Sequence, residues 1–209
     1  MSDALFATAQ AFKARIEAAI STGIVHVGAP PSDAPDGSLA LVLFDIQPNA
    51  ALRNVPRFAS PITTGPVTEP PVQIETIAVD LRFLIFAARS GSESFAADPE
   101  ELKQLGRIVA AFQADPVLNA THMANFTPPP APPNPVFDEQ IVRVSLESYA
   151  LDDWNRVWAL FPDRTFRTSL AYLATPVYIR CAEAAAYPRV RIRETRPGVL
   201  DDTPTDRAA

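Results

Sequence analysis

The side chains that most readily do chemistry are sparse in this chain. Its two histidines, His26 and His122, stand far apart among apolar or small residues. Neither has a second ligand at the three- or four-residue spacing that would place two side chains on one helical face around a metal. An ordinary packed or exposed histidine is the favoured interpretation of each, so no metal site is predicted.

Carboxylates give two weaker candidates. Asp152 and Asp153 are adjacent, but neighbouring residues of a helix point about 100° apart. Their position instead suits the positive end of the helix that is predicted to begin there. Asp45 follows a long apolar run and is the best single candidate for an acid. Its favoured role is nevertheless to close the turn before Pro48-Asn49.

Nucleotide and acyl-transfer signatures are absent from the sequence. It contains no Gly-x-Ser-x-Gly elbow, no phosphate-binding loop and no dinucleotide fingerprint. With 7 glycines in 209 residues, a backbone cradle for phosphate is implausible. The sequence therefore predicts no catalytic residue, no cofactor and no enzyme, and it favours assembly over chemistry.

Composition sets the class of protein. The length suits one domain, with room for an arm, and the net charge of -6 argues against a general binder of nucleic acid or of anionic membranes. The single cysteine, Cys181, rules out an intrachain disulfide. No apolar run approaches the roughly 20 residues that cross a bilayer, and the start at Met1-Ser2-Asp3 lacks the basic region of a secretory signal. The chain is expected to fold in the cytoplasm.

Prolines divide the chain into packed elements and loops. There are 22, clustered at 30–35, 56–71, 128–135 and 188–204, and each cluster predicts a loop or an arm. Val55–Pro71 in particular is predicted to be one long loop.

Two apolar runs predict the main strands. Leu39–Ile46 is apolar on both faces, which places it centrally in a sheet that is covered on both sides. Ile74–Ala87 alternates. One of its faces carries Val79, Leu81, Phe83 and Ile85, while the other carries Asp80, Arg82, Leu84 and Phe86. A short strand is also expected at Ile24–Val27.

Helical spacing predicts two long helices. The first begins after Ser2, ends near Gly23, and buries Leu5, Ala9, Phe12, Ile16 and Ile20. The second has Asp98 as N-cap, Pro99 in its first turn and Glu101 placed for a capping box, and it ends at Asp115-Pro116. Its buried stripe is predicted to be Leu102, Leu105, Val109 and Phe112.

The stretch Ile141–Ile179 is predicted to be the nucleus of the core. Val142, Val144 and Leu146 alternate as one face of a strand, and a second strand runs over Leu170–Ile179. Between them, a short helix carries Trp154 and Trp158 on one face and stops at Pro162-Asp163. Core packing is the favoured role of the tryptophans, and ligand stacking is the alternative.

The C-terminal part carries a second strand pattern. Arginines alternate with apolar residues over Arg189, Val190, Arg191, Ile192 and Arg193. A lone strand is not stable in water, so these five residues are predicted to pair with an edge of their own sheet or with another subunit. They are the candidate partner-binding residues. The chain is accordingly divided into a domain at 1–182 and an extended basic arm at 183–209.

Four segments in order resemble one protein family. They are Phe44-Asp45-Ile46 with Asn49 and Leu52-Arg53-Asn54, then Val79–Ala87, then Leu105-Gly106-Arg107 with Asp115-Pro116-Val117-Leu118, and last Leu151-Asp152-Asp153 to Trp158 with Ser169-Leu170-Ala171-Tyr172. The family contains the cap, or tail-terminator, proteins of phage-tail-like contractile injection systems. The chain departs from its pattern at Ala150 and at Pro162-Asp163, where the family often has a serine cap and a Gly-Thr turn.

The resemblance implies a fold and a function. The fold is α+β, with a mixed, mostly antiparallel sheet flanked by helices, as in phage tail terminators. The implied function is a structural cap: a homo-oligomeric ring, expected to be a hexamer, that ends the inner tube and anchors the last layer of sheath protein. The arm lies outside the resemblance, and from its own residues it is predicted to donate a strand to that layer. An assembly chaperone or adaptor, and an enzyme whose residues do not converge in the sequence, are the alternatives.

Overall fold

The computed structural model describes residues 4–20, 23–31, 33–53, 55, 57–59, 72–74, 76–88, 98–119, 122–123, 141–161 and 166–180. A six-stranded sheet forms its centre, in the order β1-β2-β5-β8-β7-β6. The strands are β1 (Val25–Val27), β2 (Leu39–Pro48), β5 (Thr76–Ala87), β6 (Val117–Leu118), β7 (Val142–Glu147) and β8 (Ser169–Arg180). β1 and β2 are parallel and every other pair is antiparallel. The predicted α+β class is therefore confirmed.

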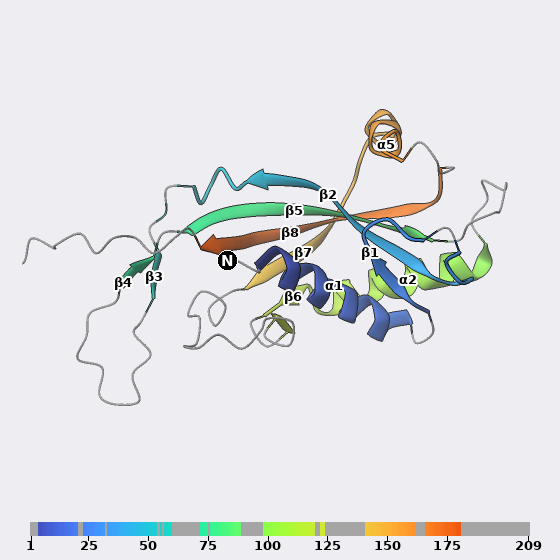
Figure 1. Ribbon diagram of the computed structural model, residues 1–209, viewed down its shortest axis with the longest axis horizontal. Helices are drawn as coiled ribbons and strands as arrows, with labels where there is room; N and C mark the ends of the chain where they lie inside the picture. Colours follow the sequence, from blue (N-terminus) through green and yellow to red (C-terminus); the bar gives the residue numbers. More distant parts are fainter. Residues whose placement is uncertain are drawn as a thin grey trace, which may run out of the picture.

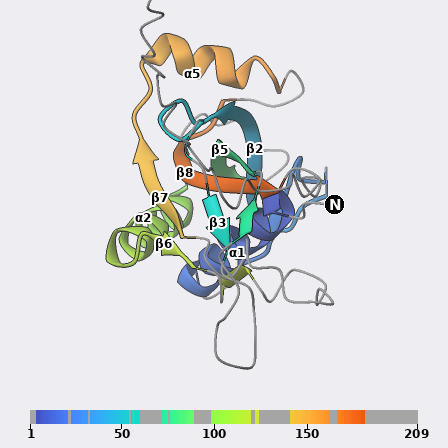
Figure 2. The same cartoon turned by 90° about the vertical axis from the view of Figure 1, so that its left-hand side faces the viewer.

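Helices cover both faces of the sheet (Figure 1). α1 (Ala4–Ile20) and α2 (Pro99–Ala114) lie against one face, here called the inner face, and α5 (Leu151–Trp158) lies over part of the other, the outer face. Seen end-on, the sheet is strongly curled between these two layers (Figure 2). A separate pair, β3 (Arg57–Ala59) and β4 (Val72–Ile74), lies beyond one end of the sheet. β3 falls within the stretch predicted to be a long loop, so that prediction is wrong at this point.

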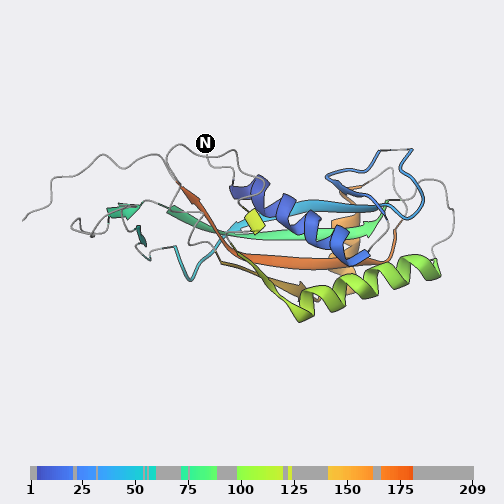
Figure 3. The ribbon, with the colours of Figure 1, turned by 90° about the horizontal axis from the view of Figure 1, so that it is seen from below.

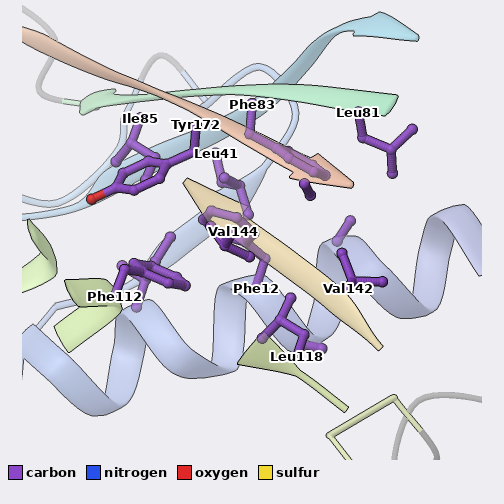
Figure 4. Packing of buried hydrophobic residues seen from close by; sticks show 14 of the residues in the cluster. Phe12, Leu41, Leu81, Phe83, Ile85, Phe112, Leu118, Val142, Val144 and Tyr172 are labelled. Atoms are coloured by element: carbon purple, nitrogen blue, oxygen red, sulfur yellow. The ribbon is translucent and has the colours of Figure 1, made fainter. Parts of the chain in front are cut away.

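The main core lies on the inner face; seen from below, α1 crosses in front of the strands and α2 runs along one side of them (Figure 3). The close-up in Figure 4 shows Phe12 of α1 surrounded by aromatic side chains from three other elements. The Phe12 ring centroid lies 5.0 Å from that of Phe83, 4.6 Å from Phe112 and 5.8 Å from Tyr172. Alanines 4, 7, 9 and 11 of α1 are also buried, because small side chains let the helix approach the sheet closely.

The alternation predicted for β5 is confirmed. Val79, Leu81, Phe83 and Ile85 all join the inner core, whereas Leu84 and Phe86 join a second cluster on the outer face. β2 also contributes to both clusters, but it is not central as predicted. It has β5 on one side, while β1 pairs only with Leu39–Leu41 on the other. β5 and β8 are the central strands.

The boundaries of the first helix and the N-cap of the second agree with the sequence patterns, whereas Glu101, which was predicted to complete a capping box, binds Arg167. α1 buries Phe12, Ile16 and Ile20 as expected. Gly23 has φ 133°, which favours glycine, and a side chain there would meet the Gly37 carbonyl oxygen at 2.8 Å. The predicted helix-capping Ser2 lies outside the described residues.

The buried stripe of α2 differs from the prediction. Asp98 caps the helix by accepting a hydrogen bond from the Glu100 N–H at 3.1 Å, but Leu102 is 52% exposed and Val109 only half-buried. Two polar side chains share the buried face because each finds a partner there: Glu101 pairs with Arg167 at 3.4 Å, and Gln104 donates to the Gly37 carbonyl at 3.2 Å. The buried residues are Glu101, Gln104, Leu105, Ile108 and Phe112.

The tryptophan unit is a secondary cluster and not the nucleus of the core. Trp158 is 6% exposed and packs with Phe86 on the outer face, away from the Phe12 core. Trp154 is only half-buried, and Leu146 of the preceding strand is 52% exposed. The reason is the position of α5, which covers only one end of the outer face, so few side chains of the sheet pack against it. Pro162-Asp163, the predicted stop, lies outside the described residues.

Candidate functional site

The outer face carries a cluster of ionised side chains next to α5. Arg82 of β5 donates from Nη1 to Asp45 Oδ2 at 2.9 Å and from Nε to Glu147 Oε2 at 3.1 Å. Tyr149, two residues beyond β7, donates from its hydroxyl to the same Glu147 oxygen at 2.7 Å. One guanidinium thus joins β5 to a carboxylate of β2 on one side and a carboxylate of β7 on the other.

A β-bulge brings Asp45 into this cluster. Leu39, Leu41 and Leu43 face the inner core, so strict alternation would have placed Asp45 there too. The register of β2 against β5 shifts between Leu43 and Asp45, and the shift turns Asp45 to the outer face opposite Arg82. The predicted role of Asp45 in turn closure is therefore wrong, because its carboxylate binds Arg82.

The curl of the sheet closes the cluster. β2 and β7 are three strand spacings apart, roughly 14 Å in a flat sheet. The ring centroids of Phe44 on β2 and Tyr149 beyond β7 are nevertheless only 6.3 Å apart. Residues of these two strands therefore converge over β5 and β8, and the ion pairs to Arg82 hold that arrangement.

The environment shifts two pKa values in this cluster. Burial alone would lower the pKa of Arg82, but the hydrogen bond to Asp45 and the negative charge of Glu147 outweigh it and raise that pKa. Burial, followed by the hydrogen bond to Glu147, raises the pKa of Tyr149 well above its ordinary value. Arg82 therefore stays cationic and Tyr149 stays a neutral donor throughout the physiological range.

The cluster borders a hollow of about 400 Å³. Its aromatic side chains are Phe44 and Tyr149, and its carboxylates are Asp45 and Glu147. With two carboxylates for the single charge of Arg82, the lining is net negative. Such a lining suits a cationic side chain, since carboxylates attract the charge and aromatic faces add a cation–π contribution.

A second polar group lies farther along the same face. Asn49 donates from Nδ2 to Asp80 Oδ1 at 2.8 Å and to Thr175 Oγ1 at 3.2 Å, and Thr175 also donates to Asp80. Asn49 Oδ1 accepts from the Leu52 N–H at 3.0 Å. Asn49, rather than Asp45, therefore closes the turn after β2 and links it to β5 and β8.

At the other end of the outer face, α5 covers an aromatic cluster. The Trp158 ring lies 5.1 Å from Phe86, 5.7 Å from Phe161 and 5.5 Å from Phe166. Its indole N–H donates to Ser169 Oγ at 3.2 Å. Core packing, the favoured role of Trp158, is confirmed, because the ring is enclosed by protein and its polar atom has a partner.

The structure does not bring the other sequence candidates together. His26 lies half-buried in β1, whereas His122 accepts from the Asn119 N–H at 3.2 Å, at the opposite edge of the sheet. Asp152 and Asp153 occupy the first turn of α5 as predicted. Within the described ranges, no three His, Cys, Asp or Glu side chains gather so that they could hold a metal ion. Arg189, Val190, Arg191, Ile192 and Arg193 lie outside the described residues, so their predicted role stays a prediction.

The sequence shows that Asp80 and Arg82 share a face, but it does not show their partners. The missing information is long-range: Arg82 meets residues 37 positions before it and 65 after it. Two clues were present. A charged pair on a strand with both faces otherwise apolar needs buried partners, and Asp45 was the only carboxylate in the preceding strand.

The remaining open features are edges. Among the strands that the structure describes, none pairs with β2 beyond Leu41 on the side of β1, and β6 pairs with only Val142 and Arg143 of β7. A groove of about 350 Å³ lies beside β7, between Leu146 and Phe112 of α2. No helix in the described part of the chain combines the length and the apolar character needed to cross a bilayer.

Comparison with known proteins gives a family match and two structural likenesses. The model of the Pvc16 N-terminal domain family matches residues 7–192. The sheath/tube terminator of PVC, an extracellular contractile injection system, in its extended state is similar with a TM-score of 0.59 at 13% identity. The match covers 95% of this chain and 65% of that one. The tube-terminating cap of the anti-feeding prophage is similar with a TM-score of 0.57 at 14% identity, over 90% of this chain and 59% of that one.

These likenesses bear on fold and on length. They confirm the predicted similarity of fold to tail terminators. The chain spans about two thirds of the length of the first structure and less of the second. No curated protein sequence matches it.

Proposed function

Because the chain belongs to the family of the Pvc16 N-terminal domain, we propose that it is the structural cap of a contractile injection system. In this role it terminates the inner tube and anchors the last layer of the sheath. The family match over residues 7–192 carries the proposal. The shared fold of a sheath/tube terminator and of a tube-terminating cap supports it. The role is structural and not enzymatic.

The cap acts as a ring of six identical subunits. Two features of the described fold support self-assembly. β2 and β7 each present an edge that is only partly paired, and these edges lie on opposite sides of one sheet. Two different edges on one subunit permit a head-to-tail contact, which closes into a ring when the rotation per subunit is right.

The partners of the ring are the inner tube protein and the sheath protein. Residues 1–182 form the terminator domain, and residues 183–209 form the arm that carries the partner-binding Arg189–Arg193. The acceptor of that arm is an edge of a sheet, because an isolated strand is not stable alone. Assembly takes place in the cytoplasm, on a particle that is afterwards released, and it involves neither nucleic acid nor a membrane.

Electron microscopy of tubes assembled with this chain tests the proposal. Inner tube protein is polymerised with and without the chain, and the ends and lengths of the tubes are recorded. A terminator adds ring-shaped density at one end, with six-fold symmetry in averaged end views, and shortens the tubes because it stops elongation. Tubes without density at either end and with unchanged lengths would show that the chain does not cap them.

A further inference from the structure

The open edge of β2 presents main-chain groups to an additional strand. The Leu41 carbonyl accepts from the Gly28 N–H on the β1 side. The main-chain N–H and C=O of Leu43, two residues on, therefore also point to that side, away from β5. The main-chain N–H of Asn49 donates to the Ala78 carbonyl of β5. Because main-chain groups alternate between the two sides of a strand, those of Ile46 point away from β5 as well. The described strands leave these outward groups of Leu43 and Ile46 without a pairing partner.

The two sides of this edge differ in character. On the inner side, Ile46 is 47% exposed and follows half-buried Leu43, so the edge is apolar there. On the outer side, Phe44, Asp45 and Gln47 line the hollow beside Arg82. An added strand would fit best if it had apolar side chains on one face and cationic side chains on the other.

The outer side is negatively charged in a form that solvent can reach. Asp45 and Glu147 are 34% and 21% exposed at the side chain, and they share one guanidinium that is 22% exposed. Asp80 adds a third carboxylate on the same face, where its side chain accepts from the neutral Asn49 and Thr175. Three carboxylates around one arginine leave an excess of negative charge for an incoming cation.

The chain itself contains a strand of the required pattern. Arg189, Arg191 and Arg193 fall on one face, and Val190 and Ile192 fall on the other. If this segment lay along β2, its arginines would face the acidic hollow while Val190 and Ile192 lay beside Ile46. The match extends to both faces of the strand, so it is more specific than charge attraction alone.

We propose that residues 189–193 of a second copy of this chain add a strand to the β2 edge, with their arginines over the acidic hollow. The proposal rests on the ring proposed above and names the contact between its neighbours. A second copy is favoured over the same chain by the position of Arg180. β8 ends there beside Thr76, and its arrow points towards the end of the sheet beyond which β3 and β4 lie (Figure 1). To reach its own edge, the chain would have to turn back and cross β5 and β2.

Disulfide trapping in assembled caps tests the contact. In full-length protein with Cys181→Ser, cysteines are introduced as Ile46→Cys and Ile192→Cys, and the protein is assembled on inner tubes and oxidised. A strand passed from copy to copy gives a ladder of covalent multimers on a non-reducing gel. The matched control replaces Ile46→Cys by Leu146→Cys, which has a similar exposure of 52% but lies on the opposite edge of the sheet.

The ladder at position 46 is expected to exceed that of the control about tenfold, since only paired strands hold the two side chains within disulfide reach. End density on the tubes without a ladder at 46 would overturn this contact and leave the cap standing. A cross-linked monomer alone would overturn the second copy as donor. Equal ladders at both edges would also contradict it. Absence of end density would refute the cap itself.

Charge reversal tests the acidic hollow separately. Arg191→Glu should lower the yield of the ladder at least about fivefold, because it sets a carboxylate against Asp45 and Glu147, whereas Arg191→Lys should retain most of it. An unchanged yield with Arg191→Glu would show that the hollow does not receive the arginines.

Discussion

The ion cluster on the outer face gives the sharpest test of the fold. Arg82 joins carboxylates of β2 and β7, through Asp45 and Glu147. Arg82→Met keeps an unbranched side chain of similar length and removes the charge and the donors. Both carboxylates are then left without their cation, and among the contacts of the described residues Glu147 keeps the hydrogen bond from Tyr149. The ion pairs that hold the curl of the sheet on this side are removed together.

The expected cost follows from the two charged hydrogen bonds that Arg82 donates. Such a bond contributes about 1.5–3 kcal/mol when buried, and Arg82 makes one to each carboxylate. The three side chains are between a fifth and a third exposed, so water compensates part of the removed interaction and the upper end does not apply. We expect Arg82→Met to lower the free energy of unfolding by about 2–3 kcal/mol.

Urea unfolding followed by tryptophan fluorescence measures this change. Trp154 and Trp158 both lie on α5, and Trp154 packs at 5.5 Å from Tyr149 of the cluster, so the signal reports on the same face. Adding Glu147→Gln to Arg82→Met should recover part of the stability, because one unpaired carboxylate is removed. If Arg82→Met unfolds within about 0.5 kcal/mol of the parent, the cluster does not hold the sheet, and the reasoning is wrong.

Two further predictions use the aromatic side chains. Trp158→Ala should lower the free energy of unfolding by about 3–5 kcal/mol, measured by thermal or urea unfolding. Trp154→Ala, at a half-buried position, is the control and should cost less. A Trp158→Ala variant that kept its melting temperature but no longer bound its partner would identify a surface contact instead. Burial raises the pKa of Tyr172 to about 12 from 10.0, so the unfolded chain loses this proton first and stability should fall as pH rises from 10 towards 12. Tyr172→Phe should therefore be more stable than the parent between pH 10 and 12 and equally stable at pH 7. If the stability of both proteins fell in the same way with rising pH, the buried hydroxyl would be contradicted.

Local patterns predicted much of the fold because they report on burial of single elements. The period of two in β5 identified the residues facing each layer, and the cap at Asp98 placed the start of α2. The same approach failed at Leu102, where a partner for Glu101 on a distant segment, Arg167, decides which face of the helix is buried. Sequence periodicity contains no information about such partners, so the error has a physical cause.

The candidate site was less predictable, for two reasons. The bulge that turns Asp45 outwards adds one residue to a run whose composition looks uniformly apolar, so its effect on alternation is invisible until the strands are paired. The second reason is the order of strands. β2, β5 and β7 meet at Arg82 only because β5 and β8 are central, whereas the apolar pattern of β2 predicted that strand to be central instead.

The segment Phe44-Asp45-Ile46 with Asn49 carries the resemblance to cap proteins, and the structure gives each of its side chains a physical task. Asp45 binds Arg82, and Asn49 binds Asp80 and Thr175, so the two polar residues hold β2 to the central strands from the outer face. Those bonds all run inwards to β5 and β8, and no described strand pairs with the opposite edge of β2 beyond Leu41, where Ile46 is exposed. The residues that fix this strand in its own sheet thereby also present its edge to a neighbour.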